Sequence, residues 1–582
     1  QVDVQWSVMN GQGGRATLVL EVGCASLRYP CASAAVARTQ GPVLAARLRR
    51  IASTRTSLAE VAAGRCEDGP ALLWRGLVIA PATPTQARDL QLPTAEALVT
   101  RWVEGLRAAA RDSRPPSALP REVTLGVGDT CVVALPPAWA GSALEGLPTD
   151  ALSATLRGAL LTLRGRGAAS ASLRLHKGTA LHDLPVRVLT PAGRLPSSVR
   201  VAVSGVEPDA EFVDDACMRA IELATASTAG ASLAAYGRAG RPTVRSTRVF
   251  TAWLEGPGLW PVGARVETIV SASANSYSGV SWLAASNHPE RVDANGVLLD
   301  TPLAGGGGVF YFHHANAPGA PTRVLEVRLE NRSAAPVDLL VMESGAGPSR
   351  DELYAGHLAT WRYMRWMARG NGLAVRLGPG QRCILDGRRM GARDVVCGIG
   401  MVAVLRGAPP SLVVEAVAAG PTEHGGEESG EAPPPAVPSV RGRGLFGPPV
   451  LEISADYTVD GPYAFIPVGG PPYGQPLGDG SPNVGNYGVE HRIHLRLVNP
   501  TAVERRVYVV FAGGGGVARG SVIIENRLVE TPLMKPSSLR EFGLGEYALP
   551  PGTACTVQVR VVPEPGSNYP VRIIAKPLPA NR

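Results

Sequence analysis

Residues 323–334 read RVLEVRLENRSA, and residues 492–502 read RIHLRLVNPTA. The two segments superpose without a gap. Apolar side chains fill every second position in both, namely Leu325, Val327 and Leu329 in the first and Ile493, Leu495 and Leu497 in the second. Such alternation is typical of a strand with one buried and one solvated face. The asparagine that follows each strand, Asn331 or Asn499, also matches. An internal repeat of two related β-domains is therefore predicted.

A second shared pattern lies downstream of each of these strands. Residues 377–383 read LGPGQRC, residues 549–555 read LPPGTAC, and a third copy, LGVGDTC, occupies residues 125–131. A glycine three residues after a leucine suits a turn into a new strand, because glycine adopts a positive φ at no steric cost. The three copies predict at least three β-sandwich domains. The cysteines that end them, Cys131, Cys383 and Cys555, are expected at equivalent core positions.

Length and composition agree with a multidomain β-protein. The chain has 582 residues, enough for roughly three to five domains, and its 68 glycines and 51 prolines are too many for a helical protein. We predict a mainly β chain with several immunoglobulin-like β-sandwich domains in tandem. The expected parts are a small α+β domain (1–115), a β-sandwich (116–205), a β-sandwich (206–420) with an inserted helix (350–369), a Pro/Gly linker (421–445) and a C-terminal β-sandwich (446–582).

Local patterns place the helices of this scheme. In the N-terminal domain we expect strands at 16–22 and 71–79, a helix at 33–52, and a second helix capped by Thr94 whose buried face holds Leu98, Trp102 and Leu106. A helix is also expected at 210–224. Ser349 and Glu352 have the spacing of a capping box at the start of the inserted helix.

The charge pattern argues against a nucleic-acid partner. The net charge is +8, but only three of the 57 basic residues are lysines (Lys177, Lys535 and Lys576), and the arginines are scattered along the chain. Phosphate recognition gathers basic residues on one face. No such cluster is present in the sequence.

The start of the chain and the length of its apolar runs indicate where the protein is located in relation to the cell. Gln1 follows no initiator Met, basic segment or apolar core segment, as expected after removal of a signal peptide. Nowhere do eighteen apolar residues run together, so no membrane-spanning helix is expected. We expect a secreted protein, either extracellular or at the cell surface.

Eight cysteines in an exported chain allow disulfides. Cys24 with Cys31 and Cys383 with Cys397 are the candidate pairs, because each pair is separated by a hairpin-sized interval. The alternative is that these cysteines are buried thiols. The absence of a CxxC sequence argues against thiol redox chemistry, zinc ribbons and c-type haem.

The histidines do not form a recognisable site. His313 and His314 are adjacent, and on a strand they would point to opposite faces, so they could not bind one ion together. His357, on the inserted helix, could come near one of them. Neither HExxH nor another known histidine–carboxylate spacing is present, so we expect structural, hydrogen-bonded histidines and predict no metal site, no cofactor and no catalytic residues.

The glycine-rich run GGGGVARG at residues 513–520 superficially resembles a phosphate-binding loop. Such a loop must lead into a helix whose N-terminus faces the phosphate, but the residues that follow here are SVIIE, which predict a strand. A β-hairpin is therefore the interpretation.

Aromatic residues are concentrated between positions 457 and 487. They are Tyr457, Tyr463, Phe465, Tyr473 and Tyr487, set among Gly, Pro and Asn. One interpretation is a long loop that wraps the last sandwich. The other is a contact arm whose tyrosines bind another subunit or a glycan.

Two family resemblances add to this picture. Residues 121–136 read REVTLGVGDTCVVALP, and GALLTLRGRGAASASLRL follows at 158–175. Residues 121–205 thereby resemble the N-terminal β-domain of pilus-assembly secretins, a likeness that does not carry over secretin function. The C-terminal half is similar to uncharacterised bacterial surface proteins with tandem immunoglobulin-like domains, which implies architecture more than activity.

Three functional hypotheses follow. The first is a non-enzymatic structural subunit of an extracellular filament, sheath or surface layer, whose partners are other copies of the chain. The second is a surface adhesin that binds polysaccharide or a cell-envelope partner. The third is an enzyme, which clustered carboxylates or histidines of perturbed pKa in a deep pocket would support.

Overall fold

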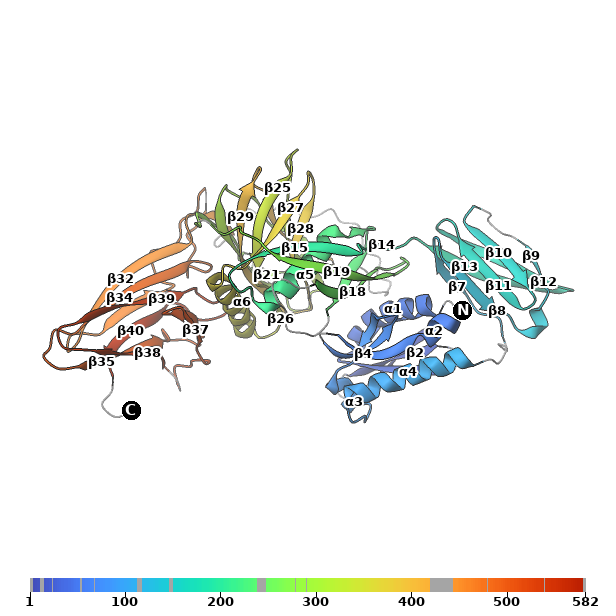
Figure 1. Cartoon of the computed structure of the whole chain (residues 1–582), viewed down its shortest axis with the longest axis horizontal. Helices are drawn as coiled ribbons and strands as arrows, with labels where there is room; N and C mark the ends of the chain where they lie inside the picture. Colours follow the sequence, from blue (N-terminus) through green and yellow to red (C-terminus); the bar gives the residue numbers. More distant parts are fainter. Residues whose placement is uncertain are drawn as a thin grey trace. The chain divides into compact units, whose positions relative to one another are not determined.

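The fold is described from a computed structural model of the chain (Figure 1). The structure describes residues 4–10, 15–22, 25–52, 55–66, 68–112, 118–145, 150–237, 247–277, 279–288, 290–418, 443–478, 480–537 and 540–578. Strands make up 53% of the structure and helices 15%, so the prediction of a mainly β chain is confirmed. The chain forms two compact units, the first being 1–200 with 220–270 and 420–425, and the second 201–219 with 271–419 and 426–582.

The first unit begins with two small sheets and four helices. The sheets are β1 (Val4–Asn10), β2 (Ala16–Val22) and β3 (Ala25–Cys31), and β4 (Val61–Cys66), β5 (Gly69–Trp74) and β6 (Leu77–Pro81). The helices are α1 (Ala34–Ile51), α2 (Arg55–Ala59), α3 (Pro84–Asp89) and α4 (Ala95–Arg111). Leu98, Trp102 and Leu106 of α4 are buried in the shared core, and the Thr94 hydroxyl caps the helix at the amide of Ala97, as predicted.

Two local predictions in this region have different outcomes. The helix expected at 33–52 is α1, whose first turn the Ser33 hydroxyl caps at the amide of Val36. The single strand expected at 71–79 is wrong, because β5 and β6 are the two arms of a hairpin. Arg75 and Gly76 both have positive φ and turn the chain between them. A tight turn inside an apolar run leaves little trace in the hydrophobic pattern.

The first unit continues with a pair of sheets around a common apolar core. One sheet has β7 (Val123–Gly126), β13 (Ala180–Leu189), β12 (Ala169–Lys177) and β9 (Ala143–Glu145), and the other has β10 (Leu152–Arg157), β11 (Leu160–Gly165) and β8 (Thr130–Ala134). It ends with β14 (Gly193–Arg194), β16 (Ala226–Ser227), β17 (Ser232–Tyr236), β18 (Thr247–Glu255) and β19 (Val262–Ala272).

A buried ion pair ties β18 to α1. Arg47 donates to both carboxylate oxygens of Glu255, at 3.0 and 2.7 Å, and its guanidinium lies over the rings of Tyr236 and Trp253. Trp253 belongs to the same core as α1 and α4 and donates its indole N–H to the carbonyl of Val78. Strand β18 therefore packs as part of the N-terminal α+β core.

The second unit contains two pairs of sheets, the first of which we call the middle sheet pair. Its larger sheet runs through β15 (Ser198–Ser204), β27 (Gly372–Leu377), β25 (Val337–Glu343), β29 (Val395–Arg406), β23 (Gly307–Asn316), β20 (Trp282–Ser286) and β31 (Arg443–Phe446), with β21 (Arg291–Val292) beside β23 and β26 (Ala346–Ser349) beside β29. Its smaller sheet has β22 (Gly296–Pro302), β30 (Ser411–Ala418), β24 (Arg323–Glu330) and β28 (Arg382–Met390).

The C-terminal sheet pair encloses a single apolar core. One sheet has β32 (Val450–Thr458), β34 (Glu490–Val498), β39 (Ala554–Val561), β36 (Ser521–Ile524) and β37 (Arg527–Glu530). The other has β33 (Ala464–Val468), β40 (Val571–Pro577), β35 (Arg505–Ala512) and β38 (Glu541–Leu549). The predicted linker at 421–445 lies almost wholly outside the described residues, which resume at Arg443 in β31.

Strands β24 and β34 carry the sequence repeat, and their surroundings are equivalent. In β24 the alternating apolar residues are buried and Leu329 pairs with Cys383 of β28, while in β34 Leu497 pairs with Cys555 of β39. The asparagine after each strand makes the same set of hydrogen bonds. Asn499 donates to the carbonyls of Val503, Leu549 and Pro550 at 2.8, 2.9 and 3.1 Å.

Asn331 donates in the same way to the carbonyls of Ala335, Leu377 and Gly378, at 2.8, 3.0 and 3.0 Å. Its side-chain oxygen accepts from the backbone and hydroxyl of Ser333, as that of Asn499 does from Thr501. The aligned asparagines therefore make equivalent hydrogen bonds in the two sheet pairs, and the internal repeat is confirmed.

The turns of the three LxxGxxC segments are also equivalent, although Cys555 is half-buried whereas Cys131 and Cys383 are buried. In each one the glycine has a positive φ, 87° at Gly128, 69° at Gly380 and 67° at Gly552. A backbone hydrogen bond closes each turn, from Asp129 to Gly126, from Gln381 to Gly378 and from Thr553 to Pro550. Each turn carries the chain from one sheet to the other sheet of its pair, from β7 to β8, from β27 to β28 and from β38 to β39.

The candidate disulfides are not supported, because no two cysteines in the described part of the chain lie at disulfide distance. Cys383 lies on β28 in the smaller sheet of the middle pair, whereas Cys397 lies on β29 in the larger sheet and is a thiol. The chain changes sheets between them, so a hairpin-sized interval does not bring the sulfurs together. Cys31 is likewise a thiol, and Cys24 lies outside the described residues.

Two further helices belong to the middle of the chain. Helix α5 (Ala210–Ala224) begins and ends where predicted, and α6 (Glu352–Ala368) lies within the expected 350–369. The capping box proposed from Ser349 and Glu352 is wrong, because Asp351 is the N-cap and accepts from the amide of Tyr354 at 3.0 Å. Ser349 instead accepts from the amide of Asp351.

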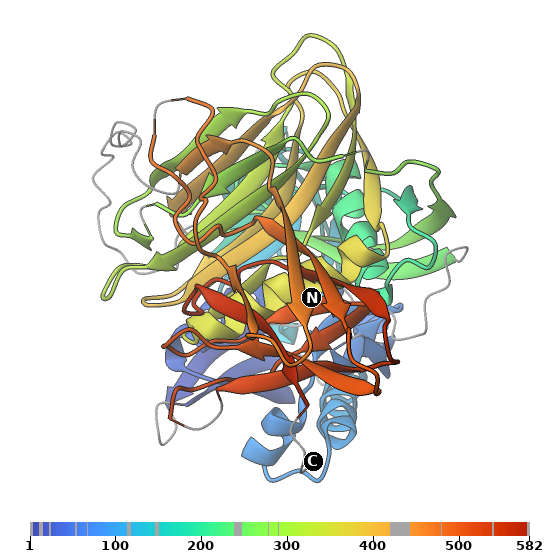
Figure 2. The same ribbon diagram turned by 90° about the vertical axis from the view of Figure 1, so that its left-hand side faces the viewer.

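Helix α6 contacts both sheet pairs of the second unit (Figure 2). On one side the carbonyl of Ala359 accepts from Ser344, whose hydroxyl also reaches the Ile399 carbonyl of β29. On the other side a side-chain carbon at Gly356 would overlap the carbonyl of Pro565, which follows β39. Glycine at this helical position lets the C-terminal sheet pair approach the helix backbone.

The buried asparagine gives a direct test of the repeat. We expect Asn499→Ala to lower the free energy of unfolding by about 3 kcal/mol, because three backbone carbonyls, of which that of Leu549 is buried, lose their donor. Asn499→Asp should cost more, since it places a carboxylate against the same carbonyls. Urea denaturation measures the change. Thr501→Ser keeps both hydroxyl bonds and serves as the matched control, and equal stability of Asn499→Ala and the control would contradict this role.

Candidate functional site

The most exposed aromatic side chains of the predicted contact arm lie at the edge of the C-terminal sheet pair. Phe465 lies on β33, which is an edge strand, and Tyr463 is the residue directly before the first residue of β33. The two rings lie 6.2 Å apart, and the residues are 57% and 49% exposed. Alternation along β33 explains this arrangement, because Ile466 and Val468 point into the core while Phe465 and Pro467 point outward. We call Tyr463, Phe465 and Pro467 the aromatic edge.

The other aromatic residues of this segment have different surroundings. Tyr457 is buried in the core of the C-terminal sheet pair, and Tyr473 is half-buried. Tyr487 stacks on Tyr311 of β23, with ring centroids 6.1 Å apart. The five residues therefore do not form one surface. The interpretation of residues 457–487 as one long loop is wrong in part, because strand β33 lies inside this segment.

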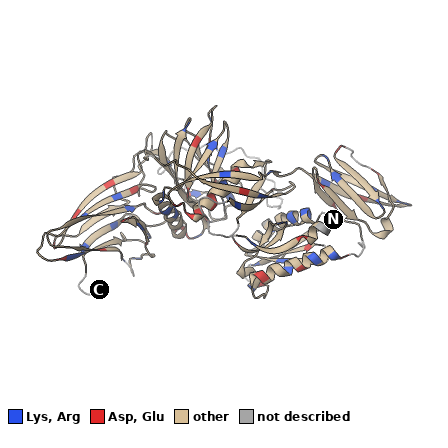
Figure 3. Cartoon of the chain, in the orientation of Figure 1, with Lys and Arg blue, Asp and Glu red and all other residues tan. Residues whose placement is uncertain are grey.

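Charged side chains of both signs are interspersed along the strands (Figure 3). Many of them pair with each other, as Arg328 does with Glu326, Glu330 and Glu415. The glycine-rich run at 513–520 connects β35 to β36, so a strand and not a helix follows it, unlike in a phosphate-binding loop. The hairpin interpretation is wrong, because β35 and β36 belong to opposite sheets of the C-terminal sheet pair. None of the helices among the described residues is both long and apolar enough to cross a membrane.

One group of side chains has ligand atoms gathered in a small space. Glu290, His313 and Glu352 each offer a nitrogen or oxygen, and these atoms lie within 4.8 Å of one another. His313 is 4% exposed, whereas Glu352 is half-buried and Glu290 is exposed. We call these three residues the Glu–His–Glu cluster. The sequence predicted no metal site here, because only the histidine was visible as a candidate.

Strand pairing explains how these distant positions meet. Strand β21 runs parallel to β23 and starts just after Glu290, whose carbonyl accepts from the amide of Ala315. His313 pairs with Cys397 of β29, and Cys397 in turn pairs with Ala346 of β26. Helix α6 follows β26 directly, and Glu352 is its first residue. Three segments therefore converge on one face of β23.

The surroundings of His313 define its chemical state. Its Nδ1 lies 3.3 Å from the side-chain oxygen of Asn287, and its Nε2 lies 3.3 Å from a carboxylate oxygen of Glu352 without a hydrogen-bond partner. Burial lowers the pKa of His313 to about 4, so the ring is neutral at pH 7. Burial also raises the pKa of Glu352, and the charge of Glu290 raises it further, while Arg291 opposes the rise.

The other two histidines considered from the sequence lie elsewhere. His314 points away from His313 and is 2.9 Å from the hydroxyl of Ser286, as expected for neighbours on a strand. His357 of α6 does not approach either of them as a ligand. Its two ring nitrogens contact Glu564 at 2.9 Å and Glu530 at 2.8 Å in the C-terminal sheet pair.

His357 and Glu564 form a buried pair between α6 and the C-terminal sheet pair. His357 is 5% exposed and the Glu564 side chain is fully buried, where it also accepts from the hydroxyl of Ser521. Burial lowers the pKa of His357, but the bond and charge of Glu564 and the bond to Glu530 outweigh it, so the pKa lies above its ordinary value. Arg519, which also bonds to Glu530, opposes this rise.

A second group of buried carboxylates lies in the middle sheet pair. Burial and the neighbouring Asp386 raise the pKa of Glu343 to about 8, and burial raises that of Asp215 to about 6. Arg388 and Arg219 provide the compensating charge, with Arg388 2.8 Å from Asp386 and Arg219 3.2 Å from Glu343.

This carboxylate group is packed tightly. A side-chain carbon at Gly345 would overlap the carboxylates of both Asp386 and Glu343. The two side chains therefore fill the space beside β25, and the arrangement is that of a compensated interior charge cluster. Sequence patterns do not reveal this carboxylate group, because its members come from α5, β25 and β28 and have no fixed spacing along the chain.

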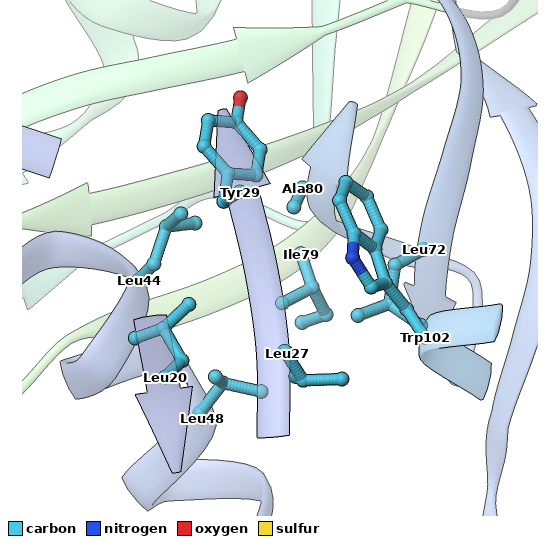
Figure 4. Close-up of a pocket in the computed structure, with 9 residues that line it drawn as sticks. All are labelled: Leu20, Leu27, Tyr29, Leu44, Leu48, Leu72, Ile79, Ala80 and Trp102. Carbon is cyan, nitrogen blue, oxygen red and sulfur yellow. The ribbon is translucent and has the colours of Figure 1, made fainter. Parts of the chain in front are cut away.

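A small apolar cavity lies in the N-terminal core of the first unit (Figure 4). It is lined by Leu20, Leu27, Tyr29, Leu44, Leu48, Leu72, Ile79, Ala80 and Trp102. Its volume of about 10 Å³ is at the lower limit for holding a single water molecule. This is a packing defect between α1, α4 and the two sheets, too small for an organic ligand.

Comparison with known proteins gives no family. No protein-family model matches the chain, and no curated protein matches it in sequence. Similar solved structures include domains 5-6 of the S-layer protein SbsC, with a TM-score of 0.11 and 11% identity over 26% of this chain and 94% of that one. Lac15 from a marine microbial metagenome has a TM-score of 0.10 and 10% identity over 79% and 89% of the two chains.

A third similar structure is SGBP-B of the Bacteroides ovatus mixed-linkage glucan utilization locus, in complex with a mixed-linkage heptasaccharide. Its TM-score is 0.12, with 9% identity over 50% of this chain and 74% of that one. Likenesses at this level carry no argument about the function of the chain.

The His357 pair predicts a pH dependence of stability. Because the pKa of His357 is raised in the folded protein, its contribution is complete below the ordinary value of about 6.5 and is lost as the pH rises through the raised value. We expect His357→Gln to destabilise the C-terminal sheet pair by about 3 kcal/mol near pH 6, since it leaves Glu564 buried without a cation.

The difference between wild type and His357→Gln should shrink as the pH is raised toward about 9. Calorimetry at a series of pH values measures it. His494→Gln removes an exposed histidine that contacts Glu452 at 3.0 Å and should have little effect at any pH. A difference that grows with pH would contradict the assignment.

Proposed function

We propose that the chain is a non-enzymatic structural subunit of an extracellular or cell-surface assembly, such as a filament, sheath or surface layer. The observation that supports this proposal is the aromatic edge of the C-terminal sheet pair. Tyr463, just before the edge strand β33, and Phe465, on that strand, expose large apolar rings side by side. Tyrosine and other aromatic side chains are enriched in protein interfaces, where they provide a large contact area at low entropic cost.

The aromatic edge favours contact through side chains over extension of the sheet. Pro467, two residues after Phe465 on the same outward face, lacks a backbone N–H and blunts the edge against another strand. A second copy of the chain would therefore bind by packing against the two rings. Aromatic rings that become buried when an interface forms typically provide much of its binding energy.

A second candidate function rests on the same two rings. In a surface adhesin that binds polysaccharide, Tyr463 and Phe465 would present their faces to sugar rings, with the tyrosine hydroxyl available to bond a sugar hydroxyl. In the first function the aromatic edge binds another copy of the chain, and in the second it binds a polysaccharide. A single set of variants at the aromatic edge therefore separates the two functions.

The finer description of the fold is part of this proposal. We take the middle and C-terminal sheet pairs to be immunoglobulin-like sandwiches that arose by duplication, since they share the buried asparagine and the sheet-changing turn. A shared fold does not by itself determine function, which depends on the sites that each domain presents. The chemistry of the chain would then reside in its surfaces.

The test uses a double substitution at the aromatic edge. We expect Tyr463→Ser with Phe465→Ser to weaken self-association at least thirty-fold, the equivalent of about 2 kcal/mol, while leaving thermal stability unchanged because both rings are exposed. Analytical ultracentrifugation and electron microscopy of the full chain measure association. Leu533→Ser, at a residue that is 40% exposed in the same sheet pair, is the matched control.

The outcomes separate the hypotheses. Loss of association in the double variant but not in the control supports the structural role. Wild-type chain that stays monomeric at high concentration but binds an immobilised polysaccharide, with binding lost in the double variant, supports the adhesin. Unchanged behaviour of the double variant in both assays excludes the aromatic edge as the contact surface.

A further inference from the structure

We propose that Glu290, His313 and Glu352 form a binding site for one divalent transition-metal ion of the zinc class. The inference does not depend on the proposed function. It rests on three observations about the cluster, namely the orientation of the histidine, the excess of negative charge around it and the distances between the ligand atoms.

The histidine is oriented as a metal ligand would be. The side-chain oxygen of Asn287, 3.3 Å from Nδ1, can only accept a hydrogen bond, so it holds the ring proton on Nδ1. The lone pair of a neutral ring is then on Nε2, which points to the carboxylates. This nitrogen is buried and has no hydrogen-bond partner. Metal-bound histidines usually donate their other N–H to a carbonyl or carboxylate oxygen in this way.

The charge around the cluster is unbalanced without a cation. Two carboxylates and a nitrogen lone pair face one another, and all three are electron-pair donors. Arg291 follows Glu290 directly but is exposed, and it supplies one positive charge against the two carboxylates. A buried acceptor without a donor is costly, and a bound cation removes that cost at Nε2 of His313.

The distances suit a small ion. A tetrahedron with bonds of ~2.1 Å has edges of about 3.4 Å, and Nε2 of His313 lies 3.3 Å from the oxygen of Glu352. The three ligand atoms lie within 4.8 Å of one another, so modest side-chain rotation of the exposed Glu290 completes three corners. A water molecule would complete the tetrahedron as the fourth ligand.

The ligand types select the class of metal. One imidazole nitrogen with two carboxylates matches the ligand preference of zinc and its neighbours. Calcium prefers six to eight oxygen ligands, and an imidazole in the innermost position is a poor substitute for them. A metal here would join the loop after β20, the middle of β23 and the first turn of α6, three segments that are distant in sequence.

The site has a consequence for the stability of the second unit. An ion that binds only the folded form stabilises it according to its concentration and affinity. Because Glu352 begins α6, and α6 contacts both sheet pairs, the ion would fix the helix on which the C-terminal sheet pair packs. The expected role is therefore structural.

The experiment uses the full chain without an affinity tag, after dialysis against a chelator. Isothermal titration with ZnCl₂ should show one site, and calorimetry should show a higher unfolding temperature with Zn²⁺ than with the same concentration of Ca²⁺. Glu290→Gln and Glu352→Gln should each weaken zinc binding at least about tenfold and abolish the temperature shift. Glu290 is exposed, so its substitution leaves folding intact.

Two further variants sharpen the assignment. Asn287→Ala leaves all three ligands in place but frees the ring of His313, and should weaken binding about tenfold. His494→Gln, at the exposed His–Glu contact with Glu452, is the matched control and should bind zinc as wild type does. Substitution of Co²⁺ for zinc should give a visible spectrum without the thiolate band that a cysteine ligand would add.

The proposal is overturned if the wild-type chain takes up no zinc, or if Glu290→Gln and Glu352→Gln bind it as well as wild type. A thiolate band in the cobalt spectrum would assign the metal to cysteines and likewise reject the site. A temperature shift with Ca²⁺ that exceeds the shift with Zn²⁺ would overturn the metal class.

Discussion

A buried asparagine side chain holds each sheet pair of the second unit together. Asn331 and Asn499 each reach across from the end of one strand to the carbonyls where the chain leaves the opposite sheet. Interior carbonyls must be paired, and here one amide group satisfies several of them at the point where the two sheets join. The register of the neighbouring strands, and thereby the position of every residue on them, depends on this connection.

Much of this architecture could be predicted from the sequence, because it depends on short-range patterns. The alternation of apolar residues in β24 and β34, and the glycines of the three sheet-changing turns, each express a constraint that lies within a few residues. The predictions that failed required knowledge of which sheet a strand joins. Cys383 and Cys397 are close in sequence, but their strands belong to opposite sheets.

The Glu–His–Glu cluster could not be predicted from the sequence for a similar reason. His313 was visible as a candidate ligand, but its neighbours come from a loop before β21 and from the first turn of α6. Their proximity follows from the parallel pairing of β21 with β23 and from the place of β26 beside β29, neither of which has a local signature. The one local clue is Glu352, but its place at the start of a helix predicts a member of a capping box rather than a metal ligand.

The burial of the cysteine thiols affects the irreversible inactivation of the protein rather than its folding. Burial raises the pKa of Cys131 and Cys397, and the reactive thiolate form is suppressed while the chain is folded. Unfolding exposes these sulfurs, and in an oxidising medium they would crosslink in arrangements that the native sheets do not permit. Refolding would then be blocked, so the working lifetime of the protein would depend on the height of its unfolding barrier rather than on its equilibrium stability.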